Sequence, residues 1–171
     1  MKLLNLILFV LLAPVIMACA PIALQPPTMS APAGDKPVGV PFDFDKFVEA
    51  NLGDVTLTTR PPQCGTWLSY LRGVVKAESN WNTNAVYKEN FKDRNGAFVL
   101  SVGYFQLSIG DKNNYKTKYC QKLTEQSLKD PETNTGCALE IIETLLKKGR
   151  PLGAYWSTMQ PKNAHKVKCN G

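Results

Sequence analysis

The stretch TWLSYLRGVVKAESNW, residues 66–81, decides the fold of this chain of 171 residues. Its apolar residues follow the spacing i, i+4, i+7 and i+8, which is one face of an α-helix: Trp67, Leu71, Val74 and Val75. The pattern predicts a helix over about residues 66–78. Glu78 is the next member of the same series, so the last turn of the helix carries a carboxyl group on its core-facing side.

Two effects act on the carboxyl group of Glu78 at this position. Apolar surroundings remove water from the carboxylate, and the C-terminal end of a helix presents the negative end of its dipole. Both effects raise the pKa of Glu78 toward the range that suits a general acid. The alternative is that the helix frays and Glu78 turns outward into water.

The rest of the chain adds further helices and one small hairpin. Residues 42–52 have the pattern of a short amphipathic helix, and residues 135–148 have that of a longer one. Asp130-Pro131 is expected to end the segment before the longer helix. Asn95-Gly96 lies between two mildly alternating runs, which is typical of a β-hairpin. The sequence therefore predicts an α+β domain that is mostly α, with a small β-hairpin.

The first residues have the pattern of an export signal. Residues 1–18 place Lys2 before an apolar run that is too short to span a membrane comfortably, and this indicates a signal peptide. The sequence Ile16-Met17-Ala18-Cys19 resembles the lipoprotein box of bacteria, although Met17 is atypical there. We therefore predict that Cys19 is lipidated; ordinary cleavage before Pro21 is the alternative.

Six prolines lie within residues 20–41, which have little to bury and predict an extended, disordered tether. The chain is thus divided into a signal peptide (1–18), a lipidated cysteine with a Pro-rich tether (19–41) and a folded domain (42–171). A lipid on Cys19 would anchor the protein to a membrane. We expect an outer-membrane lipoprotein facing the periplasm, or otherwise a periplasmic or secreted protein.

The four cysteines after the leader are an even number in an exported chain, which predicts two disulfides. Three pairings are possible. We favour Cys120–Cys137 and Cys64–Cys169, because the second would tie the C-terminal tail to the start of the domain. The sequence has no CxxC motif and no cluster of cysteine and histidine, so no metal site is expected.

The formal net charge is +6, with lysines scattered along the chain. A scattered basic surface favours anionic polymers in general, and a merely soluble basic face is an equally good interpretation. No motif for reading nucleic acid is visible, so we expect no nucleic-acid partner. No internal repeat of fixed period is visible, and we expect a monomer.

Four segments occur in a fixed order: VVKAESNW at 74–81, GYFQL at 103–107 after Ser101, DPETNTG at 130–136, and AYW at 154–156. Together they resemble the lytic transglycosylase and goose-type lysozyme family over roughly residues 67–159. The Leu-Met of that family is replaced here by Tyr-Phe within GYFQL, and its late Asn by Trp156. Such replacements would alter the shape of the glycan subsites.

The resemblance implies a lysozyme-like fold with Glu78 as the catalytic acid/base. It also implies a set of residues that bind the substrate: Ser79, Ser101, Gly103, Tyr104, Phe105, Gln106 and Tyr155. Within that set, Gly103 would allow close approach of the glycan to the backbone, Gln106 would lie near the acid, and Tyr155 would face it.

The implied reaction cleaves the β-1,4 bond between N-acetylmuramic acid and N-acetylglucosamine in the glycan strands of peptidoglycan. Glu78 alone would serve as acid and then as base, forming 1,6-anhydro-muramic acid without a cofactor. A hydrolytic muramidase is the first alternative, with Glu89 or Asp93 as a second carboxylate that positions water. Both residues are also interpretable as solvated charges near a turn. The second alternative is a wall-binding lipoprotein that does not cut.

Overall fold

The computed structural model describes residues 41–169. The predicted signal peptide, Cys19 and all of the predicted tether except Pro41 lie outside the described residues. The α-helices, in chain order, are α1 (Phe44–Asn51), α2 (Asp54–Thr58), α3 (Trp67–Ser79), α4 (Asp111–Asn114), α5 (Glu125–Leu128) and α6 (Pro131–Lys147). Three short 3-10 helices follow: η1 (Leu152–Ala154), η2 (Ser157–Met159) and η3 (Pro161–Lys166). Within the described part of the chain, no helix has the length and apolar character needed to cross a bilayer.

Helix α3 confirms the helix predicted from the opening stretch. Thr66 caps its N-terminus, because the threonine side chain accepts a hydrogen bond from the backbone N–H of Ser69. Asn80 ends the helix in the left-handed conformation, with φ of 53°. The face of α3 that lies in the core consists of Trp67, Tyr70, Leu71, Gly73, Val74 and Val75. The helix therefore holds Glu78 in its last turn above a fully buried face.

Helix α6 begins at Pro131, four residues earlier than predicted. The segment before Asp130-Pro131 does end there, as predicted, because α5 stops at Leu128; the same pair also starts α6, which the prediction did not include. The Asp130 side chain accepts a hydrogen bond from the backbone N–H of Thr133, and Pro131 occupies the first turn, where a missing N–H costs nothing. Helix α6 then packs against α1, α2, α5 and η1, and it forms the centre of the core.

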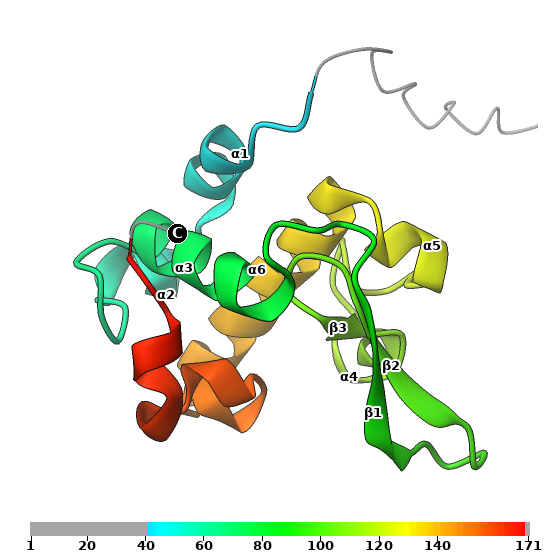
Figure 1. Ribbon diagram of the computed structural model, residues 1–171. Helices are drawn as coiled ribbons and strands as arrows, with labels where there is room; N and C mark the ends of the chain where they lie inside the picture. Colours follow the sequence, from blue (N-terminus) through cyan, green and yellow to red (C-terminus); the bar gives the residue numbers. More distant parts are fainter. Residues whose placement is uncertain (1–40, 170–171) are drawn as a thin grey trace, which may run out of the picture. The chain divides into compact units, whose positions relative to one another are not determined.

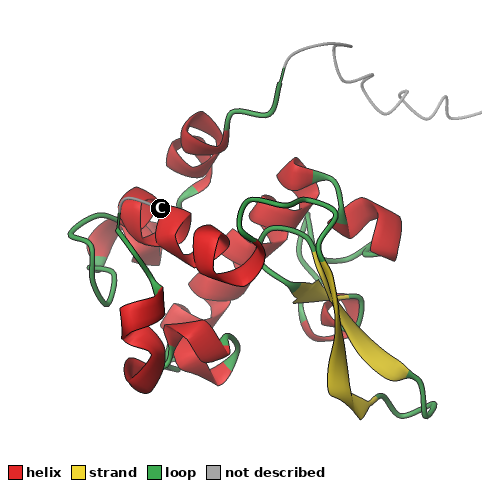
Figure 2. Ribbon diagram, in the orientation of Figure 1, coloured by secondary structure: helices red, strands yellow, loops and turns green. Residues whose placement is uncertain are grey.

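The predicted hairpin is present and forms part of a three-stranded antiparallel sheet in the order β1-β2-β3 (Figure 2). The strands are β1 (Val86–Lys92), β2 (Phe98–Val102) and β3 (Leu107–Ser108). In Figure 1 the β1–β2 hairpin extends away from the helices. The register of the pair shifts between Lys88 and Lys92, which marks a bulge in β1. The mostly helical α+β class predicted from the sequence is confirmed.

The structure confirms the favoured disulfide pairing, Cys64–Cys169 and Cys120–Cys137. The first bond ties the segment after η3 to the turn before α3. Gln63 supports the same closure, because its side-chain amide donates hydrogen bonds to the backbone oxygens of Ala164 in η3 and of Val167 just after it. The C-terminal segment is therefore held against the helix that carries Glu78.

Candidate active site

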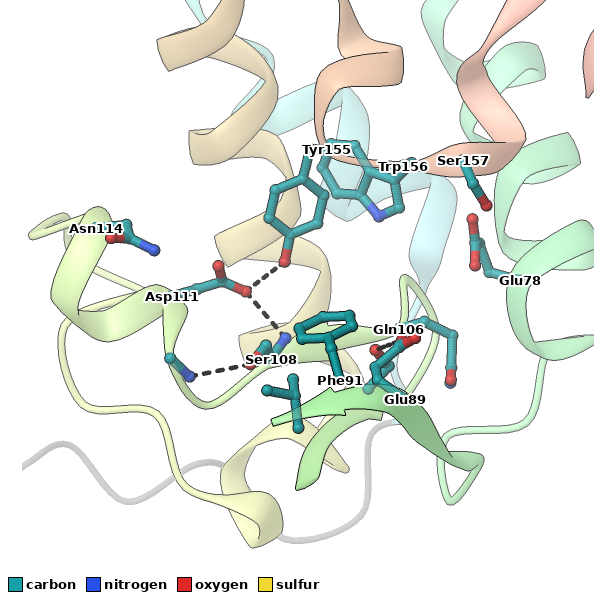
Figure 3. A pocket seen from close by; sticks show the side chains of 13 residues that line it. Glu78, Glu89, Phe91, Gln106, Ser108, Asp111, Asn114, Tyr155, Trp156 and Ser157 are labelled. Atoms are coloured by element: carbon teal, nitrogen blue, oxygen red, sulfur yellow. Dashed lines mark hydrogen bonds between the residues drawn. The ribbon is translucent and has the colours of Figure 1, made fainter. Parts of the chain in front are cut away.

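A cavity of about 470 Å³ lies where the end of α3, the sheet and the η1–η2 segment meet. This volume is within the usual range of a ligand pocket. Polar residues from different elements line it: Glu78, Glu89, Ser101, Gln106, Asp111 and Tyr155. Figure 3 shows Glu78 and Glu89 on different walls of the same space, with Asp111 and Tyr155 paired at another wall. The cavity therefore brings together three carboxyl groups from three different elements, α3, β1 and α4.

Glu78 enters the cavity from the last turn of α3, beside Ser157 (Figure 3). Burial raises the pKa of Glu78, which is the direction predicted from the sequence. The hydroxyl group of Thr158 opposes that effect by donating a hydrogen bond to Oε1 of Glu78. The nearby carboxyl group of Glu89 raises the pKa further, and the ammonium group of Lys166 lowers it. Glu78 is thus a half-buried residue whose carboxyl group has a defined hydrogen-bond donor.

The two candidates for a second carboxylate lie in different surroundings. Glu89 lines the cavity from β1, and its Oε1 accepts a hydrogen bond from the hydroxyl of Ser101. Asp93 lies at the hairpin turn, where its Oδ1 accepts hydrogen bonds from the backbone N–H groups of Asn95 (2.8 Å) and Ala97 (3.0 Å). Asp93 thus stabilises the turn and is not among the lining residues, whereas Glu89 faces the same space as Glu78.

The segment from Gly103 to Gln106 forms a tight turn beside the cavity. Gly103 has φ of +78°, and a Cβ atom there would lie 2.3 Å from the backbone oxygen of Leu128. Only glycine fits this position, because the neighbouring backbone cannot move away. Gln106 also has a positive φ, of 49°, and its side-chain amide donates a hydrogen bond to the Gly103 oxygen at 2.8 Å. The turn directs the Gln106 side chain into the cavity lining.

Asn134 of α6 holds this turn in place. Its side-chain amide donates to the backbone oxygens of Val102 (2.8 Å) and Leu128 (2.9 Å) and accepts from the backbone N–H of Phe105 (2.9 Å). The Asn134 side chain is fully buried, so water cannot reach it or the backbone groups that it contacts. These hydrogen bonds therefore satisfy polar groups that would otherwise have no partner. The DPETNTG segment thus contributes the residue that fixes the turn.

Four residues of the implied substrate-binding set do not line the cavity: Ser79, Gly103, Tyr104 and Phe105. The ring of Phe105 is fully buried between Phe44 and Trp156, and Tyr104 packs edge-on against Trp81. The Ser79 hydroxyl donates back to the backbone oxygen of Val75. In this structure these side chains pack in or against the core that supports the turn and the acid.

Tyr155 lines the cavity, but its hydroxyl does not point at Glu78. It donates a hydrogen bond to Oδ2 of Asp111, as Figure 3 shows, and the same oxygen accepts from the backbone N–H of Ser108 at 2.9 Å. The expectation that Tyr155 faces the acid is therefore wrong for this structure. The next ring, that of Trp156, is buried, and its N–H donates to the Phe105 oxygen at 2.8 Å.

Sequence reasoning missed two residues of the site, Thr158 and Asp111. Both are almost fully buried, with 8% and 4% of their surface exposed. Neither belongs to a motif: Thr158 lies in a three-residue 3-10 helix, and Asp111 begins a single-turn helix. The pattern of apolar residues does not signal elements this short, so only the tertiary contacts identify them.

Thr158→Val should raise the pKa of Glu78 above its value in the wild-type protein. The hydroxyl of Thr158 donates to the carboxylate and favours the ionised form, so the protonated form gains when the donor is removed. An NMR titration of the glutamate side-chain carboxyl carbons would measure the change. Thr158→Ser keeps a hydroxyl and should return the pKa toward the wild-type value. An unchanged pKa in Thr158→Val would contradict the assignment of this hydrogen bond.

Comparisons with known proteins bear on the family and the fold. The family model of the transglycosylase SLT domain matches residues 62–160, more than half of the chain. A search of curated protein sequences finds no significant match.

Among solved structures, the wild-type form 2 of Bd0314 DslA is similar with a TM-score of 0.61 and 25% identity, over 72% of this chain and 85% of that chain. Two variants of DslA, each with one glutamate replaced by glutamine, match at the same identity and coverage with a TM-score of 0.60. The two replaced glutamates are eleven positions apart in DslA.

These similarities confirm the lysozyme-like α+β fold. They also confirm the family expected from the four segments of sequence. The chain therefore belongs to the transglycosylase SLT domain family, whose members are lytic-transglycosylase-type enzymes that act on the glycan strands of peptidoglycan.

Proposed function

We propose that this protein cleaves the β-1,4 bond between N-acetylmuramic acid and N-acetylglucosamine, with Glu78 as the catalytic acid/base and 1,6-anhydro-muramic acid as the product. One observation carries the proposal. Glu78 is a carboxyl group whose pKa is raised by burial, and it opens into a cavity of about 470 Å³ in a chain of a glycan-cleaving family. A raised pKa extends toward higher pH the range in which Glu78 holds the proton that a general acid donates.

In the proposed reaction Glu78 first donates its proton to the oxygen that joins the two sugars. The bond from that oxygen to the anomeric carbon of the muramyl residue breaks, and N-acetylglucosamine leaves as an alcohol. The acetamido group of the muramyl residue assists at the anomeric carbon. Glu78, now ionised, takes the proton of the muramyl C6 hydroxyl, and the C6 oxygen bonds to the anomeric carbon. The ring closes without water, and Glu78 is protonated again.

Thr158 supports both halves of this cycle. Its hydroxyl donates to Oε1 of Glu78, so Oε1 is occupied and Oε2 is left for the proton that is exchanged with the substrate. The same bond stabilises the carboxylate that exists after the first proton transfer. Burial has the opposite effect and favours the protonated form. The balance allows one group to act in turn as acid and as base.

Hydrolysis to a reducing end is the second candidate function, and Glu89 is the observation that favours it. Its side chain faces the same cavity as Glu78, as a second carboxylate must do to position a water molecule. Glu78 and Glu89 are eleven positions apart, the same separation as the two glutamates replaced in the DslA variants. Asp93 is the weaker candidate, because its Oδ1 already accepts hydrogen bonds from two backbone N–H groups of the hairpin turn.

Mass spectrometry of the ends produced from purified peptidoglycan distinguishes the candidates. Our proposal predicts 1,6-anhydro-muramic ends from the wild-type protein and from Glu89→Gln, since the ring closure needs only Glu78. Reducing ends, lost in Glu89→Gln, would contradict the transglycosylase proposal and support hydrolysis. No new ends of either kind would contradict both and leave a wall-binding protein.

We also propose that the catalytic domain is a monomer, tethered to the outer membrane by lipid on Cys19. The domain would then face the peptidoglycan from the periplasmic side of that membrane. Lipoprotein maturation attaches several acyl chains, and one chain alone binds weakly. The mature protein should sediment with membranes and incorporate a fatty-acid probe, whereas Cys19→Ala should lose the probe. A mature N-terminus at Pro21 without acyl mass would contradict this proposal.

A further inference from the structure

The exposed aromatic side chains of the described residues all belong to one element. Tyr87 is 61% exposed, Phe91 is 56% exposed and Phe98 is 43% exposed, and all three belong to the β1–β2 hairpin. Leaving large apolar rings in water is unfavourable, and clustered exposed apolar groups mark interaction sites on soluble proteins. Packing within the domain therefore does not explain why these three aromatic side chains are on the hairpin surface.

The two faces of the hairpin carry different aromatic groups. Tyr87 pairs with Ser101, so their side chains share a face, and the Ser101 hydroxyl contacts Glu89 on that face. The register shift between Lys88 and Lys92 leaves three residues of β1 opposite one residue of β2. The difference between the two strands is two residues, an even number. The side chains of Phe91 and Glu89 therefore stay on the same face of the hairpin.

The cavity lining confirms this arrangement, since it includes Glu89 and Phe91 together with Val99 and Ser101. Figure 3 shows the ring of Phe91 close to Glu89 at the sheet wall. Phe98 lies on the other face, where Lys88 Nζ is 3.8 Å from the centre of its ring. One aromatic residue of the hairpin thus faces the cavity, and another, of similar exposure, is covered by a cation outside it.

We propose that Phe91 forms a sugar-binding subsite, in which its ring stacks on the apolar face of a pyranose. This pyranose is the neighbour, along the glycan strand, of the sugar that lies beside Glu89. A hexosamine ring presents C–H groups on one face, and an aromatic ring at the cavity edge covers them while the hydroxyls stay in water. Tyr87 is on the same face of β1 but on the other side of Glu89, and it does not line the cavity, so we expect it to contribute less. This inference rests on the proposed glycan substrate and adds the residue that binds the strand outside the reacting sugars.

The test measures binding without cleavage, so all variants carry Glu78→Gln. Sedimentation with purified peptidoglycan, and titration with a soluble tetramer of N-acetylglucosamine, give the apparent Kd. Phe91→Ala should raise the Kd by about fivefold to tenfold, as expected for the loss of one stacked ring. Phe91→Tyr should restore most of the binding, because the ring is kept. Tyr87→Ala should have a smaller effect of the same sign.

Phe98→Ala is the matched control, because it removes an exposed ring from the same hairpin on the face away from the cavity. It should leave the Kd unchanged, and all variants should melt at nearly the same temperature because the rings are exposed. Equal Kd values for Phe91→Ala and Phe98→Ala would overturn the subsite and leave the proposed function standing. If the Glu78→Gln protein bound neither probe, the proposed function and the subsite would both be wrong.

Discussion

Glu78→Gln is expected to lower the rate of glycan cleavage by roughly a thousandfold, within the range that general acid/base catalysis contributes. An amide has nearly the shape of a carboxyl group but has no proton to give to the leaving oxygen. Its oxygen can still accept the hydrogen bond from Thr158, so the fold should be unaffected. Release of soluble fragments from peptidoglycan gives the rate, and a melting curve of the same sample reports folding.

Glu49→Gln provides the matched control for this substitution. Glu49 is an exposed glutamate of α1 and is not among the residues that line the cavity. Its replacement should leave both the rate and the melting temperature close to those of the wild-type protein. If Glu78→Gln retained activity within a few-fold of wild type, Glu78 would not be the catalytic acid.

Asn134→Leu should have the largest effect on stability, lowering the free energy of unfolding by roughly 3–5 kcal/mol. Leucine has a similar size but leaves the N–H of Phe105 and the oxygens of Val102 and Leu128 without their buried partner. Each unsatisfied buried group costs about 1–3 kcal/mol. Urea denaturation of the domain measures the loss.

The control is Asn51→Leu, at a half-buried asparagine whose side chain makes a single hydrogen bond, to the backbone oxygen of Phe47. Its expected cost is below about 1 kcal/mol. At temperatures where Asn134→Leu is still folded, its glycan-cleaving rate should also fall, because the turn that presents Gln106 loses its tie to α6. Equal stabilities of the two variants would show that Asn134 does not hold the turn.

Periodicity located the element that matters most for the site. The apolar face of α3 is a property of local spacing, and the helix is long enough for that spacing to be unambiguous, so the place of Glu78 could be predicted. The Asn-Gly pair gave the hairpin for a similar reason, since Gly96 adopts a φ of +80° at the turn. Local rules succeed where one element is decided by its own residues.

The predicted start of α6 was wrong because an Asp-Pro pair can either follow the end of one helix or begin the next. Proline breaks a helix that precedes it, but it also fits the first turn of a helix that follows, and the Asp130 cap decides between them. Helices α2, α4 and α5 have four or five residues each, which is too few to show a period. Such short elements form because the surrounding core holds them.

The family resemblance identified the correct segments but not the task of each residue. Gln106 and Ser101 line the cavity, whereas Tyr104 and Phe105 pack against other aromatic rings. Tyr155 contacts Asp111, a partner 44 positions away that no motif marks. Side-chain direction depends on long-range packing, which a local motif does not contain.

If Glu78 supplies the proton for cleavage, two pKa values measured on the same protein should agree. One is the pKa of the Glu78 carboxyl from NMR titration, and the other is the pKa on the basic limb of kcat/KM for a soluble glycan. A general acid must be protonated, so activity should fall as pH rises through the pKa of Glu78. We expect the two values to coincide, and both to move upward together in Thr158→Val. A basic limb that differs from the Glu78 titration, or that stays in place when the Glu78 pKa moves, would contradict it.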